Sequence, residues 1–248
     1  MKTLPPEARL TEAEAAAMCC VLVTRLGGSY PRILGIRLAS GDSDEVFKWF
    51  IAAILLGAPV RADRAIAAYS ALDAHFLLGP TELAAVSQAT LAGLLTGAGV
   101  HAYARRVALT LHLVAESIAD EYDNDINRLH FFADDASDLM GRLGSLGSGL
   151  SRRAVGVFLR EMCGVWEKVP QNLNSMALYA AHNLGFAGLQ RSSAFADELR
   201  DLWEKAAQGE RTFADFEAAL MRLGENYCSM GRCVSCPMVK LCVGKVHA

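Results

Sequence analysis

Four cysteines lie close together near the C-terminus, and their spacing favours a metal centre. They are Cys228, Cys233, Cys236 and Cys242, in the pattern C-x4-C-x2-C-x5-C. Crowded thiols in a reducing compartment indicate metal binding more than disulfides. A four-cysteine zinc site usually has two C-x2-C pairs about 15 or more residues apart, whereas this segment has one such pair with close flanking cysteines. The spacing predicts a 4Fe–4S cluster, with zinc and unligated thiols as the alternatives.

Positive charge accompanies these cysteines. Arg232 lies inside the cysteine segment, and Lys240 and Lys245 lie near it. Contact with a phosphate backbone and ordinary solvated surface charge are both open interpretations. The sequence contains no second cluster motif and no glycine-rich dinucleotide motif, so we expect a structural cluster. Electron transfer without a DNA role is a third hypothesis.

A glycine-rich stretch, LGSLGSGLSRRA, forms the second candidate site. Gly147 and Gly149 allow backbone N–H groups to approach an anion, and a helix expected from Ser151 adds the positive end of its dipole. Arg152 and Arg153 add charge at the start of that helix. Such a turn can hold one DNA phosphate without reading base sequence, although a plain connector between helices is the alternative interpretation.

Composition limits the class of protein. The chain has 248 residues, of which 52% are hydrophobic and 21% charged, as in folded proteins of one or two domains. The net charge of −3 gives no overall attraction to a polyanion, so any nucleic-acid binding must come from a local patch. Neither a membrane span nor a secretory signal is evident, and we expect a cytoplasmic monomer.

The elements that must position these residues are all predicted to be helices, because no run shows sustained alternation of β-branched residues. The predicted helices are 11–25, 44–57, 61–76, 81–86, 89–96, 101–121, 126–131, 135–143, 151–163, 172–184, 191–207 and 212–224.

With the hairpin and cysteines in this order, the chain resembles the helix-hairpin-helix DNA glycosylase superfamily, specifically its endonuclease III-like branch with a C-terminal iron–sulfur cluster. The segment from Phe47 to Ala58 looks like the first barrel helix of that family, and Tyr103-Ala-Arg-Arg looks like the helix after its central turn. The resemblance covers about residues 45–243.

This resemblance implies an all-α glycosylase fold of two domains with a cleft between them. A six-helix barrel domain would span 44–163 and end in the helix-hairpin-helix. A helical domain carrying the 4Fe–4S cluster would combine 1–43 with 164–248. The implied partner is double-stranded DNA, held at Gly147, Gly149, Ser151, Arg152 and Arg153, with Arg232 on the cluster loop, while a base is flipped into the cleft and excised.

The family's catalytic residues are missing at the matching positions. Arg152 stands where bifunctional members have a lysine that forms a Schiff base, and arginine stays protonated. Pro170 stands where the family has an aspartate. The expectation is therefore a monofunctional DNA N-glycosylase whose catalytic residues are unassigned. A non-catalytic DNA- or lesion-binding protein on the same scaffold is the alternative.

Overall fold

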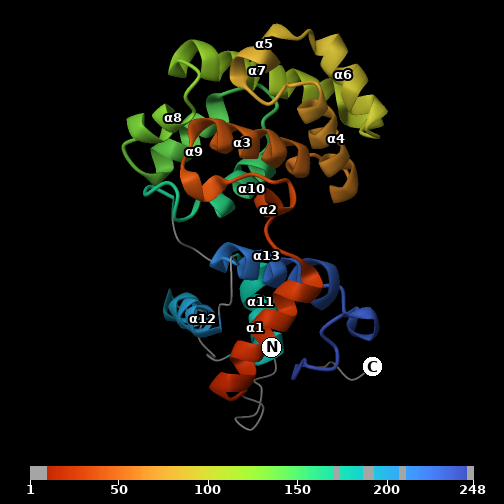
Figure 1. Cartoon of the computed structure of the whole chain (residues 1–248), viewed down its shortest axis with the longest axis vertical. Coiled ribbons are helices and arrows are strands. Elements are labelled where there is room, and N and C mark those ends of the chain that lie inside the picture. The colour runs from red at the N-terminus through yellow and green to blue at the C-terminus, as the bar shows by residue number, and fades with distance from the viewer. Residues whose placement is uncertain (1–9, 170–173, 187–192, 207–210, 245–248) are drawn as a thin grey trace. The chain divides into compact units, whose positions relative to one another are not determined.

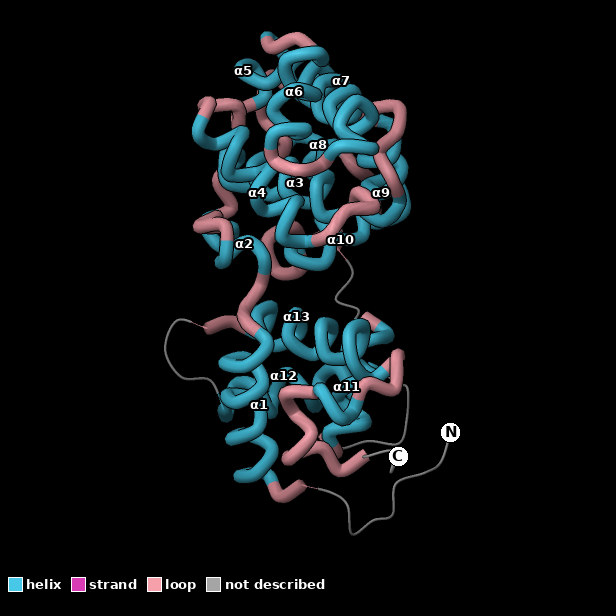
Figure 2. Tube along the Cα trace, turned by 90° about the vertical axis from the view of Figure 1, so that its right-hand side faces the viewer, coloured by secondary structure: helices cyan, strands magenta, loops and turns pink. Residues whose placement is uncertain are grey.

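The computed structural model describes residues 10–169, 174–186, 193–206 and 211–244, and Figures 1 and 2 show its helices. No strand occurs in these described ranges, which confirms the all-α prediction. None of the described helices is long and apolar enough to cross a membrane. The α-helices are α1 Glu12–Leu26, α2 Tyr30–Ile33, α3 Ser43–Gly57, α4 Ala62–Ala74, α5 Pro80–Ala85, α6 Gln88–Gly97, α7 Ala104–Tyr122, α8 Asn127–Phe132, α9 Ala136–Ser145, α10 Arg152–Met162, α11 Ser175–Leu184, α12 Ser193–Ala206 and α13 Phe213–Leu223.

Local capping explains where several of these helices begin. Asn174 precedes α11 and its side chain accepts the N–H of Met176 at 2.7 Å, so α11 begins at Ser175. The predicted start at 172 lies outside the described residues. Four short elements of the described residues escaped prediction: helix α2, the 3-10 turns Leu38–Ser40 and Cys233–Ser235, and a π-helical turn, Gly224–Cys228, that follows α13. One turn is too short to show a hydrophobic period.

The chain divides into two compact units, each described here by itself. The central unit is Leu34–Gln171, and the terminal unit combines Met1–Ile33 with Asn172–Ala248. Six helices of the central unit have ten residues or more, and α5 and α8 have six residues each. The all-helical character of both units is established, whereas the glycosylase arrangement remains a prediction.

Both predicted domain boundaries, at 44 and 163, lie within the central unit and need correction. At the first boundary, the buried carboxylate of Glu45 accepts the N–H of Arg37 at 2.6 Å, and Asn127 donates to the carbonyl of Gly41 at 2.9 Å. These bonds tie the segment before α3 to the central unit.

At the second boundary, the indole of Trp166 donates to Asn127 at 2.8 Å and its ring stacks on His130. Trp166 is also only 3% exposed, so it belongs to the core of this unit. Lys168 donates to the carbonyl oxygen of His130 at 2.9 Å. Residues after α10 therefore pack with the central unit, which the helix pattern alone did not indicate.

The core of the central unit forms around α3. Its side chains from Val46 to Leu55 are buried apart from Lys48. Against α10, the ring of Phe50 lies 4.8 Å from that of Phe158, whose carbonyl accepts the Trp49 indole N–H at 3.1 Å. A helix apolar on nearly all sides must be covered on all sides, and α4, α7 and α10 pack against it.

The terminal unit packs α1, α11, α12 and α13 around a second apolar core. Trp203 of α12 stacks on Phe216 of α13, with ring centroids 5.3 Å apart. The partly buried cysteines Cys228, Cys236 and Cys242 pack against this core. The cysteine segment is therefore anchored to the apolar core of the terminal unit.

A buried carboxylate joins the start of α13 to the segment after α1. Asp215, 1% exposed, accepts the N–H groups of Thr212 at 2.9 Å and Ser29 at 2.7 Å. Burial by itself raises the pKa of Asp215, but these hydrogen bonds and Arg32 bring the net pKa below its ordinary value of 3.8. The ionised carboxylate is therefore favoured by the fold.

The closest approach of α3 and α10 provides a first prediction. A Cβ on Gly57 would lie 2.6 Å from the Cα of Ala154, so Gly57→Ala must push the two helices apart. Overpacking of this kind costs about 2 kcal/mol. Gly156→Ala, on the exposed side of α10 with open space around its Cβ, is the matched control and should be neutral or stabilising. Urea unfolding followed by circular dichroism measures both, and equal effects would contradict this packing argument.

Asp215 gives a pH-dependent prediction. A group whose folded pKa lies below its unfolded value stabilises the fold above the unfolded pKa, and this stabilisation is lost as pH falls through the folded pKa. We expect Asp215→Asn to lower the free energy of unfolding at pH 7 by about 2 kcal/mol. The difference in free energy of unfolding between the parent and Asp215→Asn should shrink as the pH falls from 5 towards 2. Asp201→Asn, an exposed site on α12, is the control, and a gap independent of pH would disprove the proposed role.

Candidate functional site

The predicted hairpin turn lies between α9 and α10, over residues 146–151, which we call the glycine connection. Gly149 has a φ of +96°, a conformation that favours glycine. The N–H of Leu150 bonds to the carbonyl of Gly147 at 3.2 Å and tightens the turn. Ser151 then caps α10 by accepting the N–H of Ala154 at 3.1 Å.

The glycine connection packs directly on α7. A Cβ on Gly147 would lie 3.3 Å from the Cβ of Leu113, and one on Gly149 would lie 2.9 Å from the Oγ1 of Thr110. Ser117 of α7 donates to the carbonyl of Leu146 at 2.8 Å. The close contacts with α7 are enough to explain why positions 147 and 149 hold small residues. The two glycines therefore have a packing role that the sequence did not reveal.

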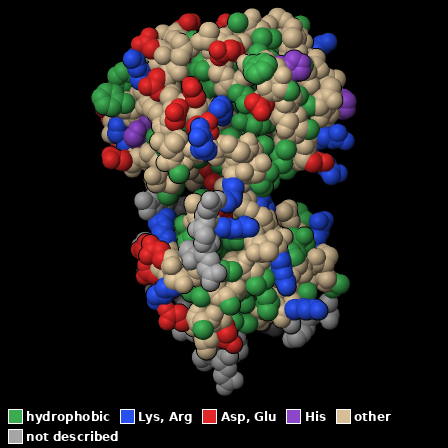
Figure 3. Space-filling view, in the orientation of Figure 1, with side chains coloured by type: hydrophobic (Ala, Val, Ile, Leu, Met, Phe, Trp, Pro, Cys, Tyr) green, Lys and Arg blue, Asp and Glu red, His purple; other side chains and the backbone are tan. Residues whose placement is uncertain are grey.

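Two positively charged side chains lie at the start of α10. Arg152 and Arg153, its first two residues, are exposed. The first N–H groups of any helix lack an intrahelical acceptor, and Ser151 satisfies that of Ala154. Two exposed cationic residues therefore stand at the positive end of a helix dipole, a combination that favours an anion. In Figure 3, basic and acidic side chains are interspersed on the central unit, whereas those of the terminal unit are more separated, with basic side chains gathered towards one edge of the view.

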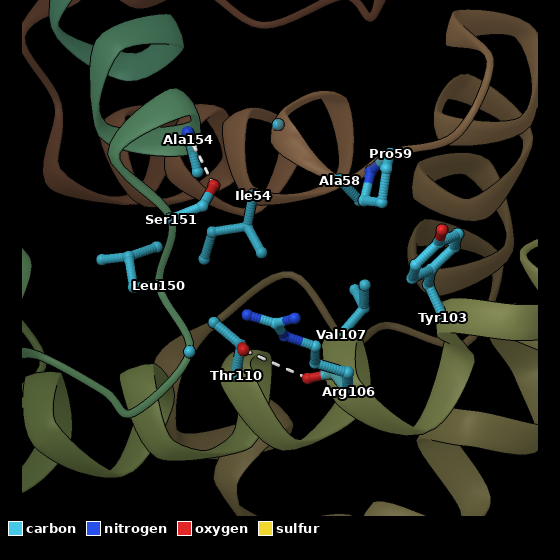
Figure 4. A pocket seen from close by; sticks show the side chains of 12 residues that line it. Ile54, Ala58, Pro59, Tyr103, Arg106, Val107, Thr110, Leu150, Ser151 and Ala154 are labelled. Carbon is cyan, nitrogen blue, oxygen red and sulfur yellow. Dashed lines mark hydrogen bonds between the residues drawn. The ribbon is translucent and has the colours of Figure 1, made fainter.

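An open cavity of about 640 Å³ adjoins the glycine connection, wholly within the central unit. In Figure 4 the guanidinium of Arg106, from α7, points into this cavity beside Thr110 and Leu150. No local sequence pattern assigns Arg106 to this site, because only tertiary packing brings α7 to the glycine connection. The lining residues are Ile54, Gly57, Ala58, Pro59, Tyr103, Arg106, Val107, Thr110, Gly149, Leu150, Ser151 and Ala154.

Acidic groups near the hairpin have structural contacts. None of the described residues that line the cavity is acidic. Asp135 caps α9 by accepting the N–H of Ser137 at 2.8 Å, and Asp138 pairs with Arg142 at 2.8 Å. Glu161, at the other end of α10, is buried and lies 3.7 Å from the Nε of Arg160. Pro170, at the position of the family aspartate, lies outside the described residues.

The cysteine segment folds back on itself. Cys228 ends the π-helical turn, and the Arg232 N–H bonds to the Tyr227 carbonyl at 2.9 Å, which closes the loop between the first two cysteines. The N–H of Cys236 bonds to the carbonyl of Cys233 at 3.1 Å. Arg232 itself is exposed, as a residue that contacts a partner must be.

All four predicted ligands line one apolar hollow. Its empty volume is about 330 Å³, part of it open to solvent, and its other lining residues include Leu184 and Met238. Burial is the largest cause that raises the pKa of Cys228 to about 11, and the neighbouring Cys242 and Cys236 also contribute to the increase.

Within the described residues, no three His, Cys, Asp or Glu side chains are close enough together to hold one metal ion. A 4Fe–4S cluster on these four cysteines therefore stays a prediction from their spacing and from the hollow that they share. All seven cysteines are free thiols, which leaves the four available as ligands.

Comparison with known proteins adds no family assignment. No protein-family model matches this chain, and no curated protein matches it. The resemblance to the helix-hairpin-helix glycosylases therefore remains a prediction that depends on the motifs and on the site geometry.

Proposed function

We propose that this chain binds double-stranded DNA at the glycine connection and the start of α10, and that it acts there as a monofunctional DNA N-glycosylase with a structural 4Fe–4S cluster. The observation that supports DNA binding best is the capped start of α10 with Arg152 and Arg153 exposed beside it. Such a site contacts one backbone phosphate and leaves the bases unread.

Arg106 extends this proposed site. Its guanidinium in the neighbouring cavity offers a further positive charge close to the glycine connection. Two contacts along one strand fix the register of a duplex more firmly than a single contact does. With a net charge of −3, a local group of this kind is what binding requires.

The cluster is proposed for Cys228, Cys233, Cys236 and Cys242. Thiolate ligands from one short segment would bind the irons, and the apolar hollow would shield the cluster from water. A structural cluster of this type would hold the exposed Arg232 in a fixed position. A reducing cytoplasm is the compartment in which such thiols persist.

A non-catalytic DNA-binding protein is the second candidate. The observation that favours it is the lack of a carboxylate among the described residues that line the hairpin cavity. Excision by an activated water needs a general base or a group that stabilises the sugar cation. In the glycosylase proposal, that group comes from outside this cavity.

DNA binding can be tested by charge removal. We expect the double variant Arg152→Ala/Arg153→Ala to weaken binding to all duplexes alike and to reduce the slope of log K against log salt by about 1 to 2, because each phosphate contact contributes about 0.9. Arg106→Ala should reduce it by about 1. The matched control, Arg64→Ala/Arg128→Ala, removes two exposed arginines elsewhere in the central unit. Fluorescence anisotropy across a salt series measures these slopes, and equal losses in test and control would rule out the hairpin as the binding site.

Base excision separates the two candidates. Excess protein is mixed with duplexes that carry deaminated, oxidised or alkylated bases, and each reaction is analysed with and without alkali. We expect strand breaks on one class of lesion only after alkali, because Arg152 cannot form the Schiff base that cleaves a strand directly. Cleavage without alkali would contradict the monofunctional assignment. Tight binding with no abasic product on any duplex would support the non-catalytic protein.

A further inference from the structure

The cavity beside the glycine connection combines one charged side chain with largely apolar walls. Among the described residues that line it, Arg106 is the only charged one. The two aliphatic hydroxyl groups of the lining already have partners, since Thr110 donates to the carbonyl oxygen of Arg106 at 3.1 Å and Ser151 accepts the N–H of Ala154 at 3.1 Å. The lining therefore suits a ligand that is held by apolar contact and by one positive charge.

Tyr103 provides a flat aromatic surface in this cavity. It ends the short 3-10 turn His101–Tyr103, which leads into α7, and it is 38% exposed. In Figure 4, Tyr103 and Pro59 lie towards one end of the cavity, Leu150 lies towards the other, and the guanidinium of Arg106 lies between these ends. An aromatic ring with this exposure is available to stack on a planar ligand.

The cavity adjoins the proposed DNA contact. Its lining includes Gly149, Leu150 and Ser151 of the glycine connection and Ala154 in the first turn of α10. A DNA strand with a phosphate at the start of α10 would bring its neighbouring nucleotides to this cavity. A nucleotide joins a planar base with apolar faces to a negatively charged phosphate, and these two properties match the apolar walls and the guanidinium.

We propose that this cavity binds one unpaired nucleotide of a DNA strand, with the phosphate at the Arg106 guanidinium and the base against Tyr103 and the apolar walls. The inference rests on the proposed DNA binding at the glycine connection and names the form of DNA that this site prefers. Bases inside a duplex are stacked and paired, so only an extrahelical base can enter. The site differs from the cleft that the glycosylase resemblance implies, because residues of the central unit alone line it.

Two fluorescent duplexes of the same sequence test this preference. One carries a single extra thymidine in one strand, and the other carries an abasic residue in place of that thymidine. Both have the same backbone charge, so the comparison isolates the base. By fluorescence anisotropy we expect the full-length protein to bind the thymidine bulge roughly 10-fold more tightly than the abasic bulge, a factor typical of one base stacked on an aromatic side chain.

Substitutions separate the base contact from the phosphate contact. Tyr103→Ala should remove most of the preference for the thymidine bulge and leave the slope of log K against log salt unchanged, because it removes no charge. Tyr103→Phe keeps the ring and should keep the preference. Arg106→Ala should weaken binding to both duplexes, because the phosphate is common to them. Tyr179→Ala is the matched control, since Tyr179 of α11 is also 38% exposed and belongs to the terminal unit.

Several outcomes would overturn this site. Equal affinity of the parent for the two bulged duplexes would do so, as would equal effects of Tyr103→Ala and Tyr179→Ala on the preference. A salt slope that still depends on Arg152 and Arg153 would then leave the proposed DNA binding intact, whereas a parent that binds no DNA would overturn the proposed function and this site with it. Displacement of the bulged duplex by micromolar thymidine monophosphate would identify a free nucleotide as the ligand and overturn the assignment to a DNA strand.

Discussion

The close contact between α3 and α10 is the constraint on which the hairpin depends. Gly57 lies against Ala154 with no room for a Cβ, so the backbones of the two helices nearly touch at the first turn of α10. The start of α10 is thereby held against the most buried helix of the central unit. Arg152 and Arg153 are exposed beside this packed turn, and a rigid backbone reduces the entropy that must be lost when such residues bind a partner.

In the terminal unit, the core must support the cysteine segment, which has little apolar surface of its own. Polar groups in the last turns of two helices hold the segment. The backbone carbonyl of Asn183, in the last turn of α11, accepts hydrogen bonds from the Gly244 N–H and the Cys242 thiol. Arg25, in the last turn of α1, donates to the carbonyl of Pro237 at 2.6 Å. The cysteine segment is thus fastened to two helices by polar bonds, and its partly buried cysteines pack against the core.

The sequence predicted the long helices well and tertiary contacts poorly, for a physical reason. Caps such as Ser151 and the apolar period of α7 are local signals, readable within a few residues. Arg106 joins the hairpin through packing between segments that are far apart in sequence, and no local pattern encodes that. The domain boundaries were misplaced for the same reason, since Trp166 belongs to the central unit through its bonds to Asn127 and His130.

The glycines of the hairpin show why a motif must be weighed against packing. From sequence they indicated an anion site, but contacts with Thr110 and Leu113 require small residues at these positions whether or not an anion binds. The arginines differ, because exposed side chains have no comparable packing requirement. The proposal of DNA binding therefore gains more from the exposed Arg152 and Arg153, and from Arg106 in the neighbouring cavity, than from the glycines that first suggested it. The four cysteines also line one apolar hollow, an arrangement that their sequence spacing alone does not require.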